Sequence, residues 1–324
     1  MSAKKRVPKN APYAWFDGEV VPWADAKLHV HTQCVMRGLN AFEGLRAYWS
    51  DAKHELFVFK LQDHLARLDR STKILRIAMP YSAEHLADSC RELLRRCEFR
   101  EDVHIRMVVY VGESIDNFGI GADGTEVGAY IFALPRTNPV AVTRGITVCV
   151  SSWRRIDDND MPARVKAGAN YLNSRYAQAQ AQSDGYDSAV LLNGDGKVSE
   201  LPGSCLMLIR GRSLITPRVT DGILESITRS VVMELAASDL GLTVEERAVD
   251  RTELYVADEV FTCGTGEEVI PIVSVDRYPV GSGAVGPLAR ELQRVYFAAV
   301  RGEDKRFESE LLPVYASDHA DAAV

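Results

Sequence analysis

The sequence predicts a globular α+β protein with two domains. Its 324 residues are about twice the length of a typical domain. Apolar residues make up 46% and charged residues 26% of the chain, which is usual for folded soluble proteins and argues against disordered, collagen-like and coiled-coil classes. The apolar run at 103–111 predicts a buried strand, whereas Leu61, Leu65 and Leu68 recur at helical spacing. Mixed strands and helices of this kind indicate the α+β class.

The charge distribution predicts small-molecule partners. Lysine and arginine number 38 against 45 acidic residues, which gives a net charge of −7 that is spread along the chain. No basic patch suited to nucleic acid or to an anionic membrane surface is evident. No apolar run reaches the roughly 20 residues that a membrane-spanning helix requires. We therefore expect neither nucleic acid nor membrane as a partner.

The cysteine content predicts a reducing compartment. The six cysteines are scattered without a C-x-x-C pair, and a chain of this length does not need disulfide bonds to fold. Near the N-terminus, Asp17 and Glu19 interrupt any apolar stretch that could form a signal-peptide core. The sequence therefore predicts a cytoplasmic protein with reduced thiols.

The domain boundary is predicted from a change in local pattern. The stretch PRTNPVAVTRG at 135–145 contains two prolines, a glycine and no regular period, so we place the interdomain linker there. A small N-terminal α+β domain is expected at 1–134 and a larger domain at 146–324. The Asp-Gly step in WFDGEVVPW predicts a β-hairpin near the start of the first domain.

Two segments of the second domain are suited to a phosphate group. The stretch from Ser226 to Gly241 reads as a helix, and its start offers unpaired N–H groups beside Ile227 and the hydroxyl-bearing Thr228. The Gly-Thr-Gly turn at 264–266 could present further amides. The alternative is that Ser226 only caps the helix and that the glycines only form a turn.

Lys166 and Glu200 are candidate chemical groups. Lys166 is flanked by small and apolar residues with no acid within four positions, a setting suited to a nucleophilic or Schiff-base lysine. Its alternative is an ordinary solvated surface lysine. Glu200 follows a predicted hairpin strand and precedes Leu201 and Pro202, which suits a buried carboxylate or, alternatively, an ordinary acid at the end of a strand.

The sequence gives less support to a metal site, a serine hydrolase or a dinucleotide-binding site. The seven histidines lack metal-ligand spacing, although His29 and His31 would share a strand face, so no metal site is assigned. No G-x-S-x-G motif marks a serine hydrolase. The G-x-G-x-x-G match at 281–286 precedes a helix, but no hydrophobic strand follows to complete a dinucleotide-binding unit, so NAD binding stays a distant alternative.

Seven motifs in order resemble one family, the class IV aminotransferases that use pyridoxal 5′-phosphate (PLP), and among them the branched-chain amino-acid aminotransferases most closely. The motifs are GLNAFEGLRAY, FKLQDHLARL, HIRMVVYVG, KAGANYLNS, GKVSELPGS, GILESITR and LYVADEVFTCGTGEE. The resemblance covers nearly the whole chain. It implies the two-domain α+β fold type IV, with a smaller α/β domain and a larger domain that has a β-barrel-like core. It also implies a homodimer.

The resemblance also assigns cofactor contacts. Lys166 would form the covalent link to PLP and move a proton between the substrate Cα and the cofactor C4′. Glu200 would face the pyridine nitrogen, where a carboxylate keeps the ring protonated. Tyr171 would hydrogen-bond the phenolic oxygen. The residues implied for the phosphate are Lys60, Ile227, Thr228 and Thr265.

The substrate positions implied by the resemblance are Arg37, Phe42, His104, Arg106, Thr265 and Gly266. Arg37 and His104 stand where the branched-chain pattern has tyrosines, Lys60 replaces an arginine, and Cys205 replaces an asparagine. We hypothesise that these changes favour a substrate with an additional polar or anionic group. The alternatives are a surface or subunit-contact role for Arg37 and a core role for His104.

The predicted activity is transfer of an amino group between an amino acid and a 2-oxo acid such as 2-oxoglutarate. A D-amino-acid or (R)-amine transaminase of the same fold is the nearest alternative, and a PLP-dependent lyase or an NAD-linked oxidoreductase is more distant. The motif FEGLR at 42–46 further predicts that Glu43 and Arg46 brace one another, and Cys205 and Cys263 are expected to be small buried residues.

Overall fold

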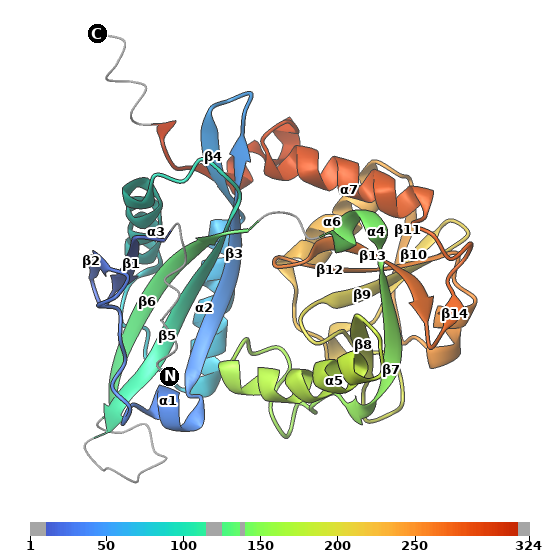
Figure 1. Ribbon diagram of the computed structural model, residues 1–324, viewed down its shortest axis with the longest axis horizontal. Helices are drawn as coiled ribbons and strands as arrows, with labels where there is room; N and C mark the ends of the chain where they lie inside the picture. Colours follow the sequence, from blue (N-terminus) through green and yellow to red (C-terminus); the bar gives the residue numbers. More distant parts are fainter. Residues whose placement is uncertain (1–10, 115–124, 137–139, 317–324) are drawn as a thin grey trace, which may run out of the picture. The chain divides into compact units, whose positions relative to one another are not determined.

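A computed structural model of the chain describes residues 11–114, 125–136 and 140–316. The chain divides into two compact units, each with its own sheet (Figure 1). The first unit contains the described residues up to Arg136, the short stretch Ala167–Ala169 and the described residues from Val300 onward. The second contains residues 140–166 and Asn170–Ala299.

The units differ in extent from the predicted domains. Residues 137–139 of the predicted linker lie outside the described residues, and the rest of it includes a short helix, α4 (Ala141–Arg144), that belongs to the second unit. The segment from Val300 onward joins the first unit, because strand β15 (Leu311–Pro313) pairs antiparallel with strand β4 (Glu55–Phe59). Sequence alone could not reveal a pairing between such distant segments.

The sheet of the first unit has seven strands in the order β15-β4-β3-β5-β6-β1-β2, and every neighbouring pair is antiparallel. Its other strands are β1 (Tyr13–Phe16), β2 (Glu19–Pro22), β3 (Asn40–Ser50), β5 (Val103–Ser114) and β6 (Thr125–Pro135). The predicted hairpin is confirmed, since β1 and β2 pair through a turn in which Asp17 and Gly18 take positive φ values of 45° and 105°. Such values suit an Asp-Gly turn.

One face of this sheet is covered by helices α2 (Leu61–Leu75) and α3 (Ala83–Cys97). Along β5, Val103, Ile105 and Met107 are buried in the core with leucines from both helices. Because side chains alternate along a strand, His104 and Arg106 lie on the opposite face. A short helix, α1 (Gln33–Arg37), precedes β3.

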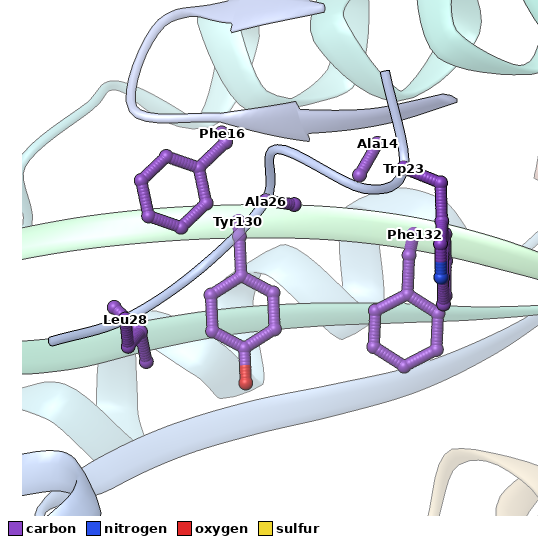
Figure 2. A pocket seen from close by; sticks show the side chains of 7 residues that line it. All are labelled: Ala14, Phe16, Trp23, Ala26, Leu28, Tyr130 and Phe132. Atoms are coloured by element: carbon purple, nitrogen blue, oxygen red, sulfur yellow. The ribbon is translucent and has the colours of Figure 1, made fainter. Parts of the chain in front are cut away.

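The face opposite the helices is rich in aromatic side chains. Tyr130 and Phe132 of β6 lie side by side with ring centroids 6.4 Å apart, and Trp23 stands perpendicular to Phe132 at 5.7 Å (Figure 2). These rings border an apolar pocket of about 360 Å³. Its lining residues are Ala14, Phe16, Trp23, Ala26, Leu28, Tyr130 and Phe132.

The sheet of the second unit mixes parallel and antiparallel pairs in the order β11-β10-β9-β12-β13-β7-β8, with β14 beside β13. Its strands are β7 (Ile146–Arg154), β8 (Ser188–Leu192), β9 (Cys205–Arg210), β10 (Ser213–Thr216), β11 (Thr243–Glu246), β12 (Glu259–Gly264), β13 (Glu268–Val275) and β14 (Tyr278–Pro279). The hairpin strand predicted before Glu200 is reduced to single bridges in the segment after β8, and one of these bridges joins Leu192 to Val198.

Three longer helices accompany this sheet: α5 (Tyr171–Ser183), α6 (Ile227–Ser238) and α7 (Pro287–Val300). Short 3₁₀ turns lie at η1 (Gly168–Asn170), η2 (Val219–Asp221) and η3 (Arg251–Tyr255), and η4 (Lys305–Glu310) precedes β15 in the first unit. The predicted cap of α6 is confirmed, because Ser226 Oγ accepts a hydrogen bond from the N–H of Arg229 at 3.2 Å. Within the described residues, no helix is both long and apolar enough to cross a membrane.

Candidate active site

Lys166 lies at the end of a loop whose backbone is held by hydrogen bonds from the side chain of Asn170. The buried side-chain amide of Asn170 donates hydrogen bonds to the carbonyl oxygens of Pro162 at 3.1 Å and Val165 at 3.0 Å. Lys166 itself is half-buried, and its Nζ lies 2.8 Å from the hydroxyl of Tyr171 at the start of α5. The structure therefore brings together the predicted amine and the predicted phenol.

Glu200 is a buried carboxylate with two separately bound oxygens. Its Oε1 lies 2.7 Å from Nη2 of Arg155, and its Oε2 accepts the backbone N–H of Leu224 at 3.0 Å. The thiol of Cys205 lies 4.0 Å from Oε2 and 3.7 Å from the Leu224 carbonyl oxygen. A guanidinium ion at this distance stabilises the charged form of a buried carboxylate. The prediction that Glu200 is a buried carboxylate is confirmed.

Arg155 is a site residue that sequence reasoning missed. It follows β7 and its guanidinium is buried, with Nε donating to the Gly222 carbonyl oxygen at 3.2 Å. Removal of either member of a buried ion pair leaves an uncompensated charge in the protein interior, so the two residues depend on one another. Nothing local in the sequence links Arg155 to Glu200, which lies 45 residues later and on a different element.

Two predicted phosphate-binding segments come together in the second unit. The hydroxyl oxygens of Thr228 in α6 and Thr265 after β12 lie 3.3 Å apart. The N–H groups of Ile227 and Thr228 belong to the first helical turn, where no intrahelical acceptor exists. The helix start and the Thr265–Gly266 turn thus present hydroxyl and amide donors to one neighbourhood, as an anion requires.

An exposed ion pair links the lysine loop to this neighbourhood. Arg164 Nη1 lies 3.2 Å from Oε1 of Glu225, the residue before the helix cap Ser226. Exposed pairs of this kind contribute little to stability. The contact nonetheless places the segment before Lys166 beside the segment before α6 within the second unit.

In the first unit, Phe42 and Arg106 are neighbours. The guanidinium of Arg106 lies 4.4 Å from the centre of the Phe42 ring, a cation–π distance. Nearby on β3, a Cβ atom at Gly44 would lie only 3.2 Å from the His104 ring, so the glycine makes room for this half-buried histidine. These three predicted substrate residues therefore share one face of the sheet.

Arg37 and Lys60 already have partners within the chain. Arg37 is half-buried and its guanidinium hydrogen-bonds the side-chain oxygen of Gln33, one turn earlier. The ammonium of Lys60 lies 3.0 Å from Glu310 and 3.2 Å from Asp63. Burial would lower the pKa of Lys60, but the hydrogen bonds to these two carboxylates raise it above its usual value.

The predicted brace between Glu43 and Arg46 is wrong. The motif is part of β3, so residues three apart face opposite sides of the sheet. Glu43 instead accepts hydrogen bonds from Arg67 at 2.7 and 2.8 Å and lies 2.7 Å from His64 Nδ1, both in α2. Arg46 Nη2 donates to the carbonyl oxygen of Arg136 at 3.1 Å. By contrast, the predicted burial of Cys205 and Cys263 is confirmed.

The glycine motif at 281–286 does not offer a dinucleotide site. At the start of α7, the N–H groups of Leu288 and Ala289 donate to the carboxylate of Glu259 at 3.0 and 2.8 Å. A side chain at Gly286 would overlap this carboxylate, since its Cβ would lie 2.0 Å from Glu259 Cδ. The protein's own carboxylate thus takes the place where a pyrophosphate would bind.

The second unit thus holds an amine beside a phenol, a buried carboxylate paired with an arginine, and a helix start that offers hydrogen-bond donors. Such a set would suit a PLP-dependent transferase. A model of the amino-transferase class IV family matches residues 40–275. The chain belongs to this family and is an aminotransferase, which confirms the family, the fold class and PLP as cofactor, as predicted from the motifs. Its second sheet corresponds to the curled, half-barrel sheet of this fold.

Individual relatives agree in length and fold. The chain is 40% identical to a probable branched-chain-amino-acid aminotransferase of Aquifex aeolicus over 303 residues, covering 94% of this chain and 97% of that protein. It is 36% identical to the branched-chain-amino-acid aminotransferase of Escherichia coli K12 over 301 residues, covering 91% and 95%. The PLP form of the branched-chain amino acid aminotransferase from Thermobaculum terrenum is 39% identical, with a TM-score of 0.89 over 94% of this chain and 99% of that one.

The donor set of the second unit fits PLP. An aldehyde needs an amine, which Lys166 beside Tyr171 could supply. A pyridinium nitrogen needs an anionic partner, which Glu200, paired with Arg155, could supply. A phosphate needs several hydrogen-bond donors, which Thr228, Thr265 and the start of α6 could supply.

Proposed function

We propose that this aminotransferase moves an amino group between a branched-chain-like amino acid and a 2-oxo acid such as 2-oxoglutarate. The relatives named above support the substrate class. A further branched-chain amino acid aminotransferase of known structure is 34% identical, with a TM-score of 0.87 over 94% of this chain and 99% of that one, and it was crystallised with N-(5′-phosphopyridoxyl)-L-glutamate. The contact between Lys166 and Tyr171 is the observation that carries the proposal.

The candidate site residues of the second unit have separate roles in this proposal. Bound PLP supplies an electron sink that stabilises negative charge at the substrate Cα. Lys166 would hold the cofactor through its amine and serve as the base for the proton at Cα, and Tyr171, 2.8 Å from that amine, would orient it and hydrogen-bond the cofactor's phenolic oxygen. Glu200, which is paired with Arg155, would face the ring nitrogen. Thr228 binds the phosphate.

The remaining cofactor and substrate positions stay part of the proposal. The backbone N–H of Ile227 and the side chain of Thr265 contribute to phosphate binding, and the turn from Thr265 to Gly266 receives a substrate carboxylate. Phe42 and Arg106 contribute to the substrate pocket. Lys60 is the weakest of the proposed phosphate contacts, because two carboxylates already hold its ammonium group.

An additional polar or anionic preference at Arg37 and His104 is the finer part of the proposal. Arg37 can offer charge to a substrate only by sharing or leaving its contact with Gln33. Rates with leucine, glutamate and aromatic amino acids should therefore shift relative to one another in Arg37→Ala if the residue contacts the substrate. An unchanged ratio would assign Arg37 to a structural role. A homodimer and a cytoplasmic location complete the proposal.

A cofactor-labelling experiment tests the core of the proposal. The purified protein is incubated with PLP, reduced with borohydride and digested, and the peptides are mapped by mass. We expect the pyridoxyl group on Lys166 and loss of visible absorbance in Lys166→Ala, with Lys197→Ala as a matched control that keeps both. A pyridoxyl group on another lysine would contradict the proposal.

A donor panel then separates the alternatives. With 2-oxoglutarate as acceptor, L-leucine should support transfer and D-amino acids and (R)-amines should not. Activity restricted to D-glutamate would establish the D-amino-acid transaminase instead. Release of pyruvate without an acceptor would establish a lyase.

A further inference from the structure

In the second unit, the hydroxyl groups of Thr262 and Ser204 form a line of hydrogen bonds that leads to the carboxylate of Glu267. Glu267 follows the Thr265–Gly266 turn. Ser204 Oγ donates to Glu267 Oε2 at 2.6 Å. Thr262 Oγ1 lies 2.5 Å from Ser204 Oγ and 2.9 Å from the Cys205 carbonyl oxygen. The turn is thereby connected through side chains to the backbone of the neighbouring strand β9.

The hydroxyl groups of this line have little freedom to move. Ser204 and Thr262 are both buried, and Thr262 belongs to β12, which pairs antiparallel with β9 through Leu206. A Cβ atom at Gly264 would lie 3.2 Å from Cβ of Ser204, so the serine is packed closely against this strand end. A buried hydrogen bond to a charged group is one of the stronger contacts in a protein.

The backbone and the side chain of Glu267 both restrain the turn. Its N–H donates to the Gly264 carbonyl oxygen at 3.0 Å and closes the hairpin loop between β12 and β13. Among the described residues, the N–H groups of Thr265 and Gly266 donate to no backbone carbonyl. The loop is thus held at its third residue while the amides of its first two residues remain available to an anion.

We propose that Glu267 is a positioning residue that fixes the Thr265–Gly266 turn through its hydrogen bond with Ser204, so that the turn amides are preorganised for the substrate carboxylate. The inference rests on the proposed function, which assigns that carboxylate to the turn. Preorganisation raises affinity because less conformational freedom is lost on binding. The bond, rather than the negative charge of Glu267, supplies the effect.

Three variants separate the hydrogen bond from the charge. E267A removes both, S204A removes the donor and keeps the charge, and E267Q keeps an acceptor for Ser204 and removes the charge. S238A is the matched control, because Ser238 Oγ lies 2.6 Å from Asp239 Oδ2 on the exposed end of α6. All are compared as PLP-loaded enzymes.

The main readout is the Kd of 4-methylvaleric acid, a simple carboxylate, measured from the change in cofactor absorbance. We expect E267A and S204A to weaken binding about tenfold and to raise KM for leucine and 2-oxoglutarate more than they lower kcat. E267Q should stay within about threefold of the unmodified enzyme and S238A should match it.

Unchanged probe binding in S204A would overturn the proposal, as would an E267Q variant as impaired as E267A. If E267A fails to fold, the S204A and E267Q pair decides the matter. The result is distinct from a failure of the proposed function, which would already appear as absent transfer or absent Lys166 labelling in the unmodified enzyme.

Discussion

Arg155 and Glu200 form a buried ion pair in which Nη2 lies 2.7 Å from Oε1. Both side chains are more than nine-tenths buried, so both charged groups are shielded from water. Each charge is compensated by the opposite charge of its partner. Arg155 also holds the Gly222 carbonyl oxygen, while Glu200 holds the Leu224 N–H. The pair therefore holds the Glu200 carboxylate in position and restrains the loop that leads to α6.

Replacing Arg155 by methionine should leave Glu200 buried without its main partner. We expect a loss of about 3 kcal/mol in the free energy of unfolding, because breaking a buried pair exposes an uncompensated charge to an apolar environment. PLP affinity should fall as well. Urea unfolding and PLP titration check both. Arg144→Met is the control, since its pair with Asp187 is exposed, and equal stability losses in the two variants would contradict the expectation.

Replacing Tyr171 by phenylalanine should affect the reaction rather than the fold. The change keeps the ring and removes the hydroxyl that lies 2.8 Å from Lys166 Nζ. We expect kcat to fall about tenfold, equivalent to about 1.4 kcal/mol, while the melting temperature changes little. Pre-steady-state measurement of the first half-reaction gives the rate. A variant with the original rate would show that the phenol has no part in orienting the lysine.

Glu43 makes stability depend on acid pH. Burial alone would raise the pKa of its carboxyl group, but the charges and hydrogen bonds of Arg67 and His64 hold that pKa well below its usual range. A depressed pKa contributes stability above the unfolded value of about 4.3, and this contribution is lost as the pH falls further.

We therefore expect Glu43→Gln to cost about 3 kcal/mol at pH 7, where the unmodified protein has the charged carboxylate, and progressively less below about pH 4. Urea unfolding of both proteins across this range measures the difference. A difference that is independent of pH would show that the carboxylate charge is not what stabilises the contact between β3 and α2.

Gly286 should tolerate no side chain. An alanine Cβ would lie 2.0 Å from Glu259 Cδ and would displace the carboxylate from the N–H groups of Leu288 and Ala289. We expect Gly286→Ala to lower the free energy of unfolding by about 2 kcal/mol, the scale of a lost helix cap plus strain. In a Glu259→Ala background the same change should cost much less. Equal costs in both backgrounds would exclude the overlap as the cause.

Local signals in the sequence were sufficient for several elements. The Asp17–Gly18 hairpin and the Ser226 cap depend on neighbouring residues only, so their patterns could be recognised directly. The ordered motifs likewise identified the family, and through it Lys166 and Glu200. How those two residues act in this chain stays a prediction until it is measured.

Contacts between distant segments could not be predicted in this way. Arg155 and Glu267 bond residues 45 and 63 positions away, and neither has a distinctive local pattern. The partner of Glu43 could not be predicted for a related reason, because Glu43 and Arg46 both belong to a strand, where side chains three residues apart point to opposite faces. The order of the strands in the sheet decides which distant residues become neighbours. The local periodicity of the sequence does not encode that order.

The pairing of β15 with β4 has a consequence for protein synthesis. Every strand of the second unit is synthesised before β15. The first unit, whose synthesis begins first, is therefore the last to be completed. A nascent chain that stops before Glu310 leaves β4 as an open sheet edge, and open edges recruit strands from other chains. Truncated translation products should therefore aggregate through the amino-terminal unit, even though the missing residues lie at the other end of the polypeptide.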